Sequence, residues 1–439
     1  MDAISGLPFF PLEITKEGTL FSAQQRSAIE NAASQAGAGK VTDFFVISHG
    51  WNNDMADARD LYNGLFASVA ALIPARPSLA NRKFAIVGVF WPSKKFADSE
   101  LIPSGGAAGI GGADLSSSVL KQKLESLKGT FDVPDEAALE HAKSLIDGLE
   151  NSPAKQKEFV DLIRSLVPQT PSDTTDDASD RFLKRSASEI MRTLSGPAMM
   201  VPSPGGGGGA LGLNDQAGGA VSLGDFFSGA KAAASRLLNF ATYYQMKERA
   251  GVVGKALNGM LASIRQLRPD LRVHLIGHSF GARVVTAAVD GPVAIGPASL
   301  ALLQGAFSHN GFAAKFDGKK DGFFRKVVAQ SKVVGPILAT HTVNDRAVGI
   351  AYALASRFSN DNAAALGDEN DVFGGIGRNG AIKLKPAEFV KAALLPATSP
   401  YQFTAGKVHN LKADTFIKGH SDIEGPQVAN AILCAVAAV

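Results

Sequence analysis

The stretch LRVHLIGHSFGAR, residues 271–283, decides the fold class of this chain. A short apolar run ends in Gly-His-Ser-Phe-Gly and continues directly into small residues that suit a helix. This pattern predicts a strand, a sharp turn and a helix, with Ser279 on the turn. Gly277 and Gly281 flank the serine, because a β-carbon at either position would collide with the adjoining strand and helix. We therefore predict that the hydroxyl of Ser279 projects above a β-sheet.

Short apolar runs rich in strand-forming residues recur along the chain, and helix-compatible segments separate most of them. The runs are Phe44–Ser48, Phe84–Phe90, Val273–Ile276, Leu300–Phe307, Gly335–His341 and Phe403–His409. Apolar residues at helical spacing predict helices from Asp54 to Ile73 and from Glu248 to Leu267. Buried strands that alternate with helices predict an α/β fold, with a mostly parallel sheet and helices on both faces.

Residues 96–244 interrupt this alternation. Glu136–Leu149 and Ala154–Leu166 have helical patterns, whereas stretches such as the glycine run 205–209 are typical of flexible joints. We expect a core formed by residues 1–95 and 245–439, and a large helical insertion over 96–244 that precedes the strand leading to Ser279. Such an insertion would act as a lid if it folded over the site.

Composition limits the class of protein. The chain has 439 residues, 45% hydrophobic and 19% charged, with a net charge of +3, which is typical of a globular protein and argues against a nucleic-acid partner. Cys434 is the only cysteine, so neither an intrachain disulfide nor a cysteine-rich metal site is expected. We find no secretory signal and no run of transmembrane length, which predicts a cytoplasmic protein, although export by another route stays open. The oligomeric state is not predicted.

A serine hydroxyl is a weak nucleophile unless a base and an acid that orients the base accompany it. Asp345 lies in the loop that follows the predicted strand Gly335–His341, where the catalytic groups of open α/β sheets collect. It is therefore the candidate acid, and Asp317 and Asp321 are weaker alternatives.

His420 is the candidate base, because it lies in a loop after the last predicted strand and after the acid in the chain. Among the eight histidines, His409 and His274 are expected within strands, and His341 precedes the acid. His278 adjoins the serine, and His309 follows the Leu300–Phe307 run, which makes both candidates for lining a substrate pocket. No pair of histidines has the spacing of a metal site, so we expect no catalytic metal.

The segment His49-Gly50-Trp51-Asn52 follows the first predicted strand of the core. Gly50 would allow close approach of a substrate, and the backbone amides of Trp51 and Phe280 would donate to an oxyanion. His49, Gly50 and Asn52 are further pocket candidates.

These motifs resemble those of the α/β-hydrolase superfamily of serine hydrolases, and most of all bacterial esterases with a His-Gly-aromatic-Asn segment. The resemblance covers about residues 1–95 and 245–439, and rests on His49–Trp51, Gly277–Gly281, Asp345 and His420. It implies a Ser-His-Asp mechanism without a cofactor. Cap domains of the superfamily often lie between the sixth and seventh strands, whereas the long insertion here comes earlier in the chain.

The expected activity is hydrolysis of carboxylic esters, from either small-molecule or lipid substrates, through an acyl-enzyme. Three alternatives stay open: a lipase or phospholipase that contacts a membrane surface, an acyltransferase or thioesterase, and a non-catalytic binding scaffold.

Overall fold

A computed structural model of the chain describes residues 2–35, 37, 40–51, 53–93, 116–172, 179–195, 229–345, 347–348 and 373–439. Asn52 and the glycine run 205–209 lie outside these ranges. The chain divides into two compact units: unit 1 contains Met1–Ser93, Arg249–Asp345 and Gly375–Val439, and unit 2 contains Lys94–Glu248 and Arg346–Gly374.

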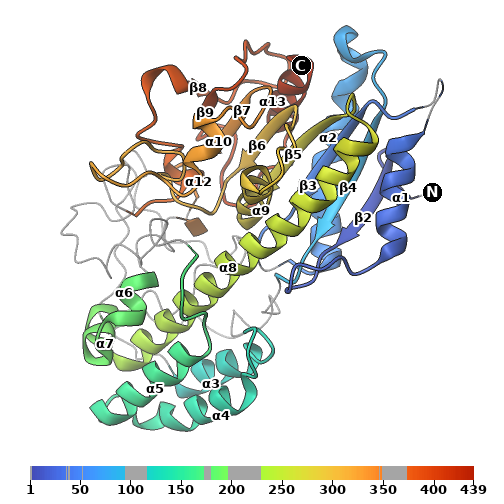
Figure 1. The fold of residues 1–439 in the computed structure, drawn as a ribbon. Coiled ribbons are helices and arrows are strands. Elements are labelled where there is room, and N and C mark those ends of the chain that lie inside the picture. Colours follow the sequence, from blue (N-terminus) through green and yellow to red (C-terminus); the bar gives the residue numbers. More distant parts are fainter. Residues whose placement is uncertain are drawn as a thin grey trace. The chain divides into compact units, whose positions relative to one another are not determined.

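Unit 1 is built on one nine-stranded sheet within the described residues, which confirms an α/β fold with a mostly parallel sheet (Figure 1). The strand order is β1-β2-β4-β3-β5-β6-β7-β9-β8, and only the pair β1–β2 is antiparallel in this series. The strands are β1 (Ala3–Ile4), β2 (Leu7–Glu13), β3 (Asp43–Ser48), β4 (Phe84–Phe90), β5 (Arg272–His278), β6 (Ser299–Leu303), β7 (Ile337–His341), β8 (Phe389–Ala393) and β9 (Val408–Lys412).

Two strand predictions are displaced. The run Leu300–Phe307 was expected to be one strand, but β6 ends at Leu303 because Gln304 adopts a φ of 46° and turns the chain. The run Phe403–His409 begins too early, since β9 starts at Val408. Phe403, the first residue of the predicted run, lies outside the sheet and stacks on Tyr401 at 4.7 Å.

Helices cover both faces of the sheet in unit 1. On one face α2 (Met55–Leu72) packs with α13 (Pro426–Ala437), and their apolar residues share a core with the strands. On the other face lie α1 (Ala23–Ser34), α9 (Phe280–Asp290) and the second part of α8 (Ala230–Leu267) (Figure 1). The side chain of Asp54 caps α2 by accepting from the amides of Ala56 and Asp57. The shorter elements are α10 (Arg325–Ala329), α12 (Ile376–Asn379) and the 3₁₀ turns Ile73–Ala75, Pro77–Leu79 and Pro386–Glu388.

All the regular secondary structure in the described residues of unit 2 is helical. Its elements are α3 (Ser117–Ser126), α4 (Glu136–Leu145), the 3₁₀ turn Ile146–Gly148, α5 (Pro153–Ser165), α6 (Ser179–Lys184), α7 (Ala187–Ser195) and the first part of α8. Buried leucine, isoleucine and phenylalanine side chains of α3, α5 and α7 form its interior. Of the helices that the structure describes, none combines the length and apolar character required to cross a bilayer.

Candidate functional site

Ser279 occupies the sharp turn between β5 and α9. Its backbone has φ 55° and ψ −124°, a left-handed conformation that typically costs about 1–3 kcal/mol for a residue other than glycine. A β-carbon on Gly277 would overlap the carbonyl oxygen of Gly281, and one on Gly281 would overlap that of Ser48. The two glycines therefore let strand and helix meet closely enough to hold this turn.

The structure brings Ser279, His420 and Asp345 into one hydrogen-bonded series, which we name the carboxyl-end relay. Oγ of Ser279 lies 2.8 Å from Nε2 of His420, and Nδ1 of His420 lies 2.9 Å from Oδ2 of Asp345. Because an ionised carboxylate only accepts, Nδ1 carries the proton and Nε2 is free to accept the serine hydroxyl. This is the tautomer that a general base requires.

The three residues of the carboxyl-end relay come from loops at one edge of the sheet. Ser279 follows β5, Asp345 follows β7 and His420 follows β9. These strands are parallel neighbours through β6, so their carboxyl ends meet at the same edge. All three side chains are largely enclosed, with Ser279 5% and His420 6% exposed. Enclosure strengthens the hydrogen bonds between them, since water competes less for each partner.

The chain after β3 approaches the serine closely at Gly50. A β-carbon on Gly50 would lie 2.5 Å from Cβ and 3.0 Å from Oγ of Ser279. Nδ1 of His49 lies 2.9 Å from the carbonyl oxygen of Gly50 and donates to it. In a trans peptide the carbonyl and the following N–H point in opposite directions, so the amide of Trp51 faces away from the His49 ring.

Phe280, which carries the second amide expected to bind an oxyanion, is the first residue of α9. Amides of a first helical turn lack an acceptor within the helix and add the positive end of the helix dipole. The ring of Phe280 meets that of Trp51 edge-on at 6.3 Å, which ties the two donor segments together.

His49 and His278, predicted to line a pocket, are packed into the framework instead. Nε2 of His49 accepts from the amide of Trp91 at 3.2 Å, and the two rings stack at 5.7 Å. Nε2 of His278 donates to the carbonyl oxygen of His420 at 3.0 Å. Burial lowers the pKa of His49 to about 4. Burial and, next, the neighbouring His420 lower the pKa of His278 to about 3. Both rings are therefore neutral, and they hold the loops that carry Gly50 and His420.

The remaining candidates have other partners. His309 is buried and its Nδ1 lies 3.0 Å from Nδ2 of Asn379. Asp317 and Asp321 are exposed and accept from lysine amides of their own loop. His341, at the end of β7, has its pKa lowered to about 4 by burial. Asn52 lies outside the described residues.

One residue of the site escaped the sequence analysis. Nε2 of Gln304, directly after β6, donates to Oδ2 of Asp345 at 3.1 Å. The signal available in the sequence is a single polar residue inside the apolar run Leu300–Phe307. Its proximity to Asp345 depends on a pairing of β6 with β7 that spacing alone does not reveal.

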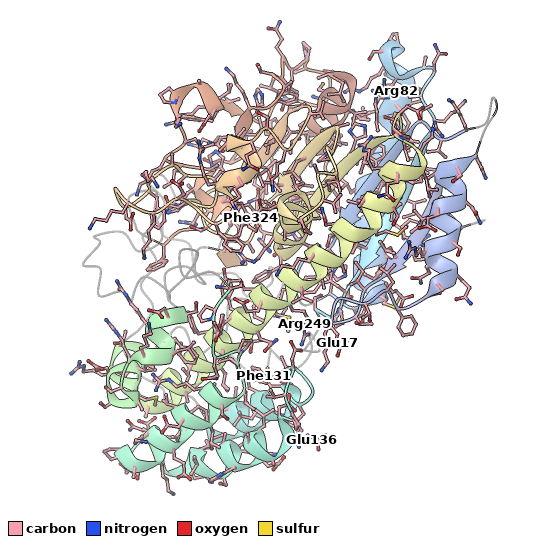
Figure 2. All side chains as sticks on the ribbon, viewed as in Figure 1. Glu17, Arg82, Phe131, Glu136, Arg249 and Phe324 are labelled. Carbon is pink, nitrogen blue, oxygen red and sulfur yellow. The ribbon has the colours of Figure 1, made fainter. Side chains whose placement is uncertain are left out.

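A second Asp–His–Ser series, the amino-end relay, lies at the opposite end of the sheet. Nε2 of His274 lies 3.1 Å from Oδ1 of Asp43, and its Nδ1 lies 2.8 Å from Oγ of Ser299. All three side chains are buried. Arg82, labelled in Figure 2, forms an ion pair with Asp43 and lies 3.2 Å from Nε2 of His274.

Among the residues that the structure describes, no group of three or more His, Cys, Asp or Glu side chains is arranged to hold a metal ion. Comparisons with protein-family models, with curated protein sequences and with solved structures find no match to this chain. The geometry of the carboxyl-end relay is therefore the basis for assigning a function.

Proposed function

We propose that this protein is a serine hydrolase of the α/β-hydrolase type that cleaves carboxylic esters through an acyl-enzyme. The observation that carries the proposal is the carboxyl-end relay, in which Ser279, His420 and Asp345 are joined at 2.8 and 2.9 Å beside a strained turn. The helices between β4 and β5 in the chain are, in this proposal, an insertion into the hydrolase core.

In the first half of the reaction Oγ of Ser279 attacks the ester carbonyl while Nε2 of His420 takes the hydroxyl proton. The tetrahedral intermediate collapses, the bond to the leaving oxygen breaks, and His420 returns its proton to the departing alcohol. Water then attacks the acyl-enzyme with His420 as the base, which releases the acid and restores the serine hydroxyl. Asp345 holds the imidazole in the required tautomer and stabilises its cation.

Negative charge that develops on the carbonyl oxygen is stabilised by the amides of Trp51 and Phe280. The contact of Gly50 with Ser279 and the position of Phe280 at the start of α9 support this assignment. One such donor typically contributes about 3–4 kcal/mol to transition-state stabilisation.

A fluorophosphonate probe tests the proposal, because it reacts with a serine only where a base and an oxyanion site activate it. We expect the wild-type chain and Ser299→Ala to be labelled, and Ser279→Ala to remain unlabelled. Ser299 is a matched control, since its hydroxyl also lies 2.8 Å from a buried imidazole nitrogen. Absence of labelling in the folded wild type, or equal labelling of Ser279→Ala, would overturn the proposal.

Turnover of p-nitrophenyl esters then shows which acyl chains the enzyme accepts and whether water or an alcohol receives the acyl group. Release of p-nitrophenol from esters of short and long acyl chains is the expected result. Transfer to an added alcohol in preference to water would redefine the enzyme as an acyltransferase, and activity confined to emulsified lipid would redefine it as a lipase.

A further inference from the structure

Gln304 is buried directly beside the candidate acid, with no measurable exposure. Its Nε2 donates to Oδ2 of Asp345 at 3.1 Å and to the carbonyl oxygen of Gly377 at 2.8 Å. Because both partners only accept, the orientation of the amide is fixed, with its NH₂ group toward them. Its Oε1 has no hydrogen-bond partner among the described residues. A buried carbonyl without a partner destabilises the fold, so another role accounts for a glutamine at this position.

The backbone around Gln304 is held in an uncommon conformation. Its φ of 46° is left-handed, and its amide donates to Oγ1 of Thr340 at 3.1 Å. The amide of Gly377 donates to the carbonyl oxygen of Gly305 at 2.9 Å. A β-carbon on Gly377 would lie 2.5 Å from the carbonyl carbon of Gln304, so a glycine is required for this approach. The end of β6, the start of α12 and the loop after β7 thus converge on one side-chain amide.

We propose that Gln304 is a positioning residue that sets the orientation and charge of Asp345 for the reaction. This inference rests on the proposed function. Oδ2 of Asp345 accepts from Nε2 of Gln304 and also from Nδ1 of His420, the latter at 2.9 Å. Two donors on one oxygen restrict rotation of the carboxylate, and the amide withdraws part of the negative charge that would otherwise act on the imidazole.

Removing the amide has two consequences that follow from this geometry. The carboxylate gains freedom to rotate, so fewer molecules hold the imidazole ready to accept the serine proton. The charge on Oδ2 also becomes less dispersed, so it stabilises the imidazolium form of His420 more strongly. The base then remains protonated to higher pH, and activity is lost at a higher pH on the acid side.

The main test compares Gln304→Met with Gln245→Met. Gln245 is also fully buried, donates to a carboxylate (Asp132, at 2.6 Å) and has an Oε1 without a partner among the described residues, but it belongs to unit 2. We expect Gln304→Met to lower kcat/KM by about tenfold, the scale of a charge-assisted hydrogen bond, and to move the acid limb of its pH profile upward by about half a pH unit. Gln245→Met should leave the position of that limb unchanged.

A second variant guards against a folding defect. Asparagine tolerates left-handed backbone better than most residues, so Gln304→Asn suits the φ of 46°. Its amide is one methylene shorter and does not reach Asp345. We expect a folded protein with the same upward movement of the acid limb as in Gln304→Met.

The imidazole titration of His420, followed by ¹⁵N NMR and assigned by its loss in His420→Gln, gives a readout that does not need turnover. Its midpoint should move to higher pH in both Gln304 variants. If Ser279 is labelled but neither the acid limb nor this midpoint moves, the inference fails and the proposed function stands. If Ser279 is never labelled, the proposed function fails, and the midpoint alone decides whether Gln304 sets the charge of Asp345.

Discussion

The two ends of β5 carry the same three residue types in the same hydrogen-bonded order, yet we propose a catalytic role for only one of them. His274 of the amino-end relay and Ser279 of the carboxyl-end relay are five positions apart on one segment of chain. In each relay a carboxylate, an imidazole and a serine hydroxyl lie within 3.1 Å of their neighbours. Hydrogen-bond distances alone therefore do not single out Ser279 as the serine that we propose to be reactive.

The surroundings of the two serines make the difference. Ser299 is the first residue of a regular strand, whereas Ser279 stands on a strained turn beside Gly50 and the first turn of α9. Because Asp43 accepts from Nε2 of His274, Nδ1 of that ring accepts from the hydroxyl of Ser299, just as the imidazole accepts from the serine in the carboxyl-end relay. Arg82 forms an ion pair with the same carboxylate.

The buried carboxylate of the amino-end relay, Asp43, has its charge compensated by Arg82. Burial alone would raise the pKa of Asp43, but hydrogen bonds from Arg82, then His274 and Thr42, outweigh it and hold that pKa well below its usual range. Arg82 also donates to the carbonyl oxygen of Val436 at 2.8 Å. The amino-end relay therefore joins β3, β5 and β6 to the C-terminal helix.

The largest effect that separates the two relays is expected from their carboxylates. Asp345→Asn should lower kcat by about 10⁴-fold, because the amide favours the wrong imidazole tautomer. Asp43→Asn should leave kcat nearly unchanged but lower the free energy of unfolding by about 3 kcal/mol, since it leaves the partly buried Arg82 without its counter-charge. Ester turnover gives kcat and urea unfolding gives the free energy of unfolding for both variants. Similar losses of kcat in the two variants would contradict the different roles assigned to the two relays.

A smaller effect on kcat is expected when a side chain fills the space beside Ser279. The methyl group of Gly50→Ala would lie 2.5 Å from Cβ of Ser279, so the chain must shift and displace the amide of Trp51. Loss of one oxyanion donor typically lowers kcat by about 10²–10³-fold. Gly259→Ala is the matched control, because nothing in the described structure lies within 4 Å of the added carbon. Unaltered turnover by Gly50→Ala would remove this segment from the site.

The smallest expected difference between the two ends of the sheet is the pH at which protonation of their buried groups begins to destabilise the fold. The pKa values of His49 and His278, lowered to about 4 and about 3, lie below the unfolded value near 6.5. Between these values the unfolded chain binds more protons, so the free energy of unfolding falls as pH falls from about 6.5. Asp43 is an acid rather than a base, but its lowered pKa also makes the free energy of unfolding fall as the pH falls. That loss of stability begins only below about pH 4.

We expect the neutral state of His49 and of His278 each to lower the free energy of unfolding of the protein by about 2 kcal/mol between pH 7 and pH 4.5. His278→Gln, which retains a donor toward His420, should have a correspondingly flatter pH dependence in urea unfolding. The same slope in wild type and variant would show that His278 accepts a proton in the folded protein.

Residues close in sequence were the predictable part of this molecule. The run around Ser279 predicts its turn because glycine spacing, a strand and a helix all lie within thirteen residues. Loop positions after strands likewise led to Asp345 and His420, which the structure brings together. Contacts that need the strand order, such as Gln304 with Asp345 or His274 with Asp43, were not predictable from spacing.

The strands at or next to the two edges of the sheet, β2 and β8, were not predicted, and the physical reason differs between them. β2 contains Pro8 and Pro11, which cannot donate a backbone hydrogen bond and argue against a strand, but it lies next to the edge of the sheet. β8 is an edge strand with partly exposed side chains, so it lacks the continuous apolar run of the central strands.

The anchoring of α12 has a consequence for how this chain tolerates changes in length. The amide of Thr342 donates to the carbonyl oxygen of Gly377 at 3.0 Å, and Arg378 donates to that of Val343 at 2.6 Å. The two ends of the segment 346–374 are thereby fastened to each other beside Asp345. Because both hydrogen bonds are made by residues outside 346–374, we expect Asp345 and α12 to keep their register when the chain between them is lengthened or cut, which limited proteolysis followed by a turnover assay would check.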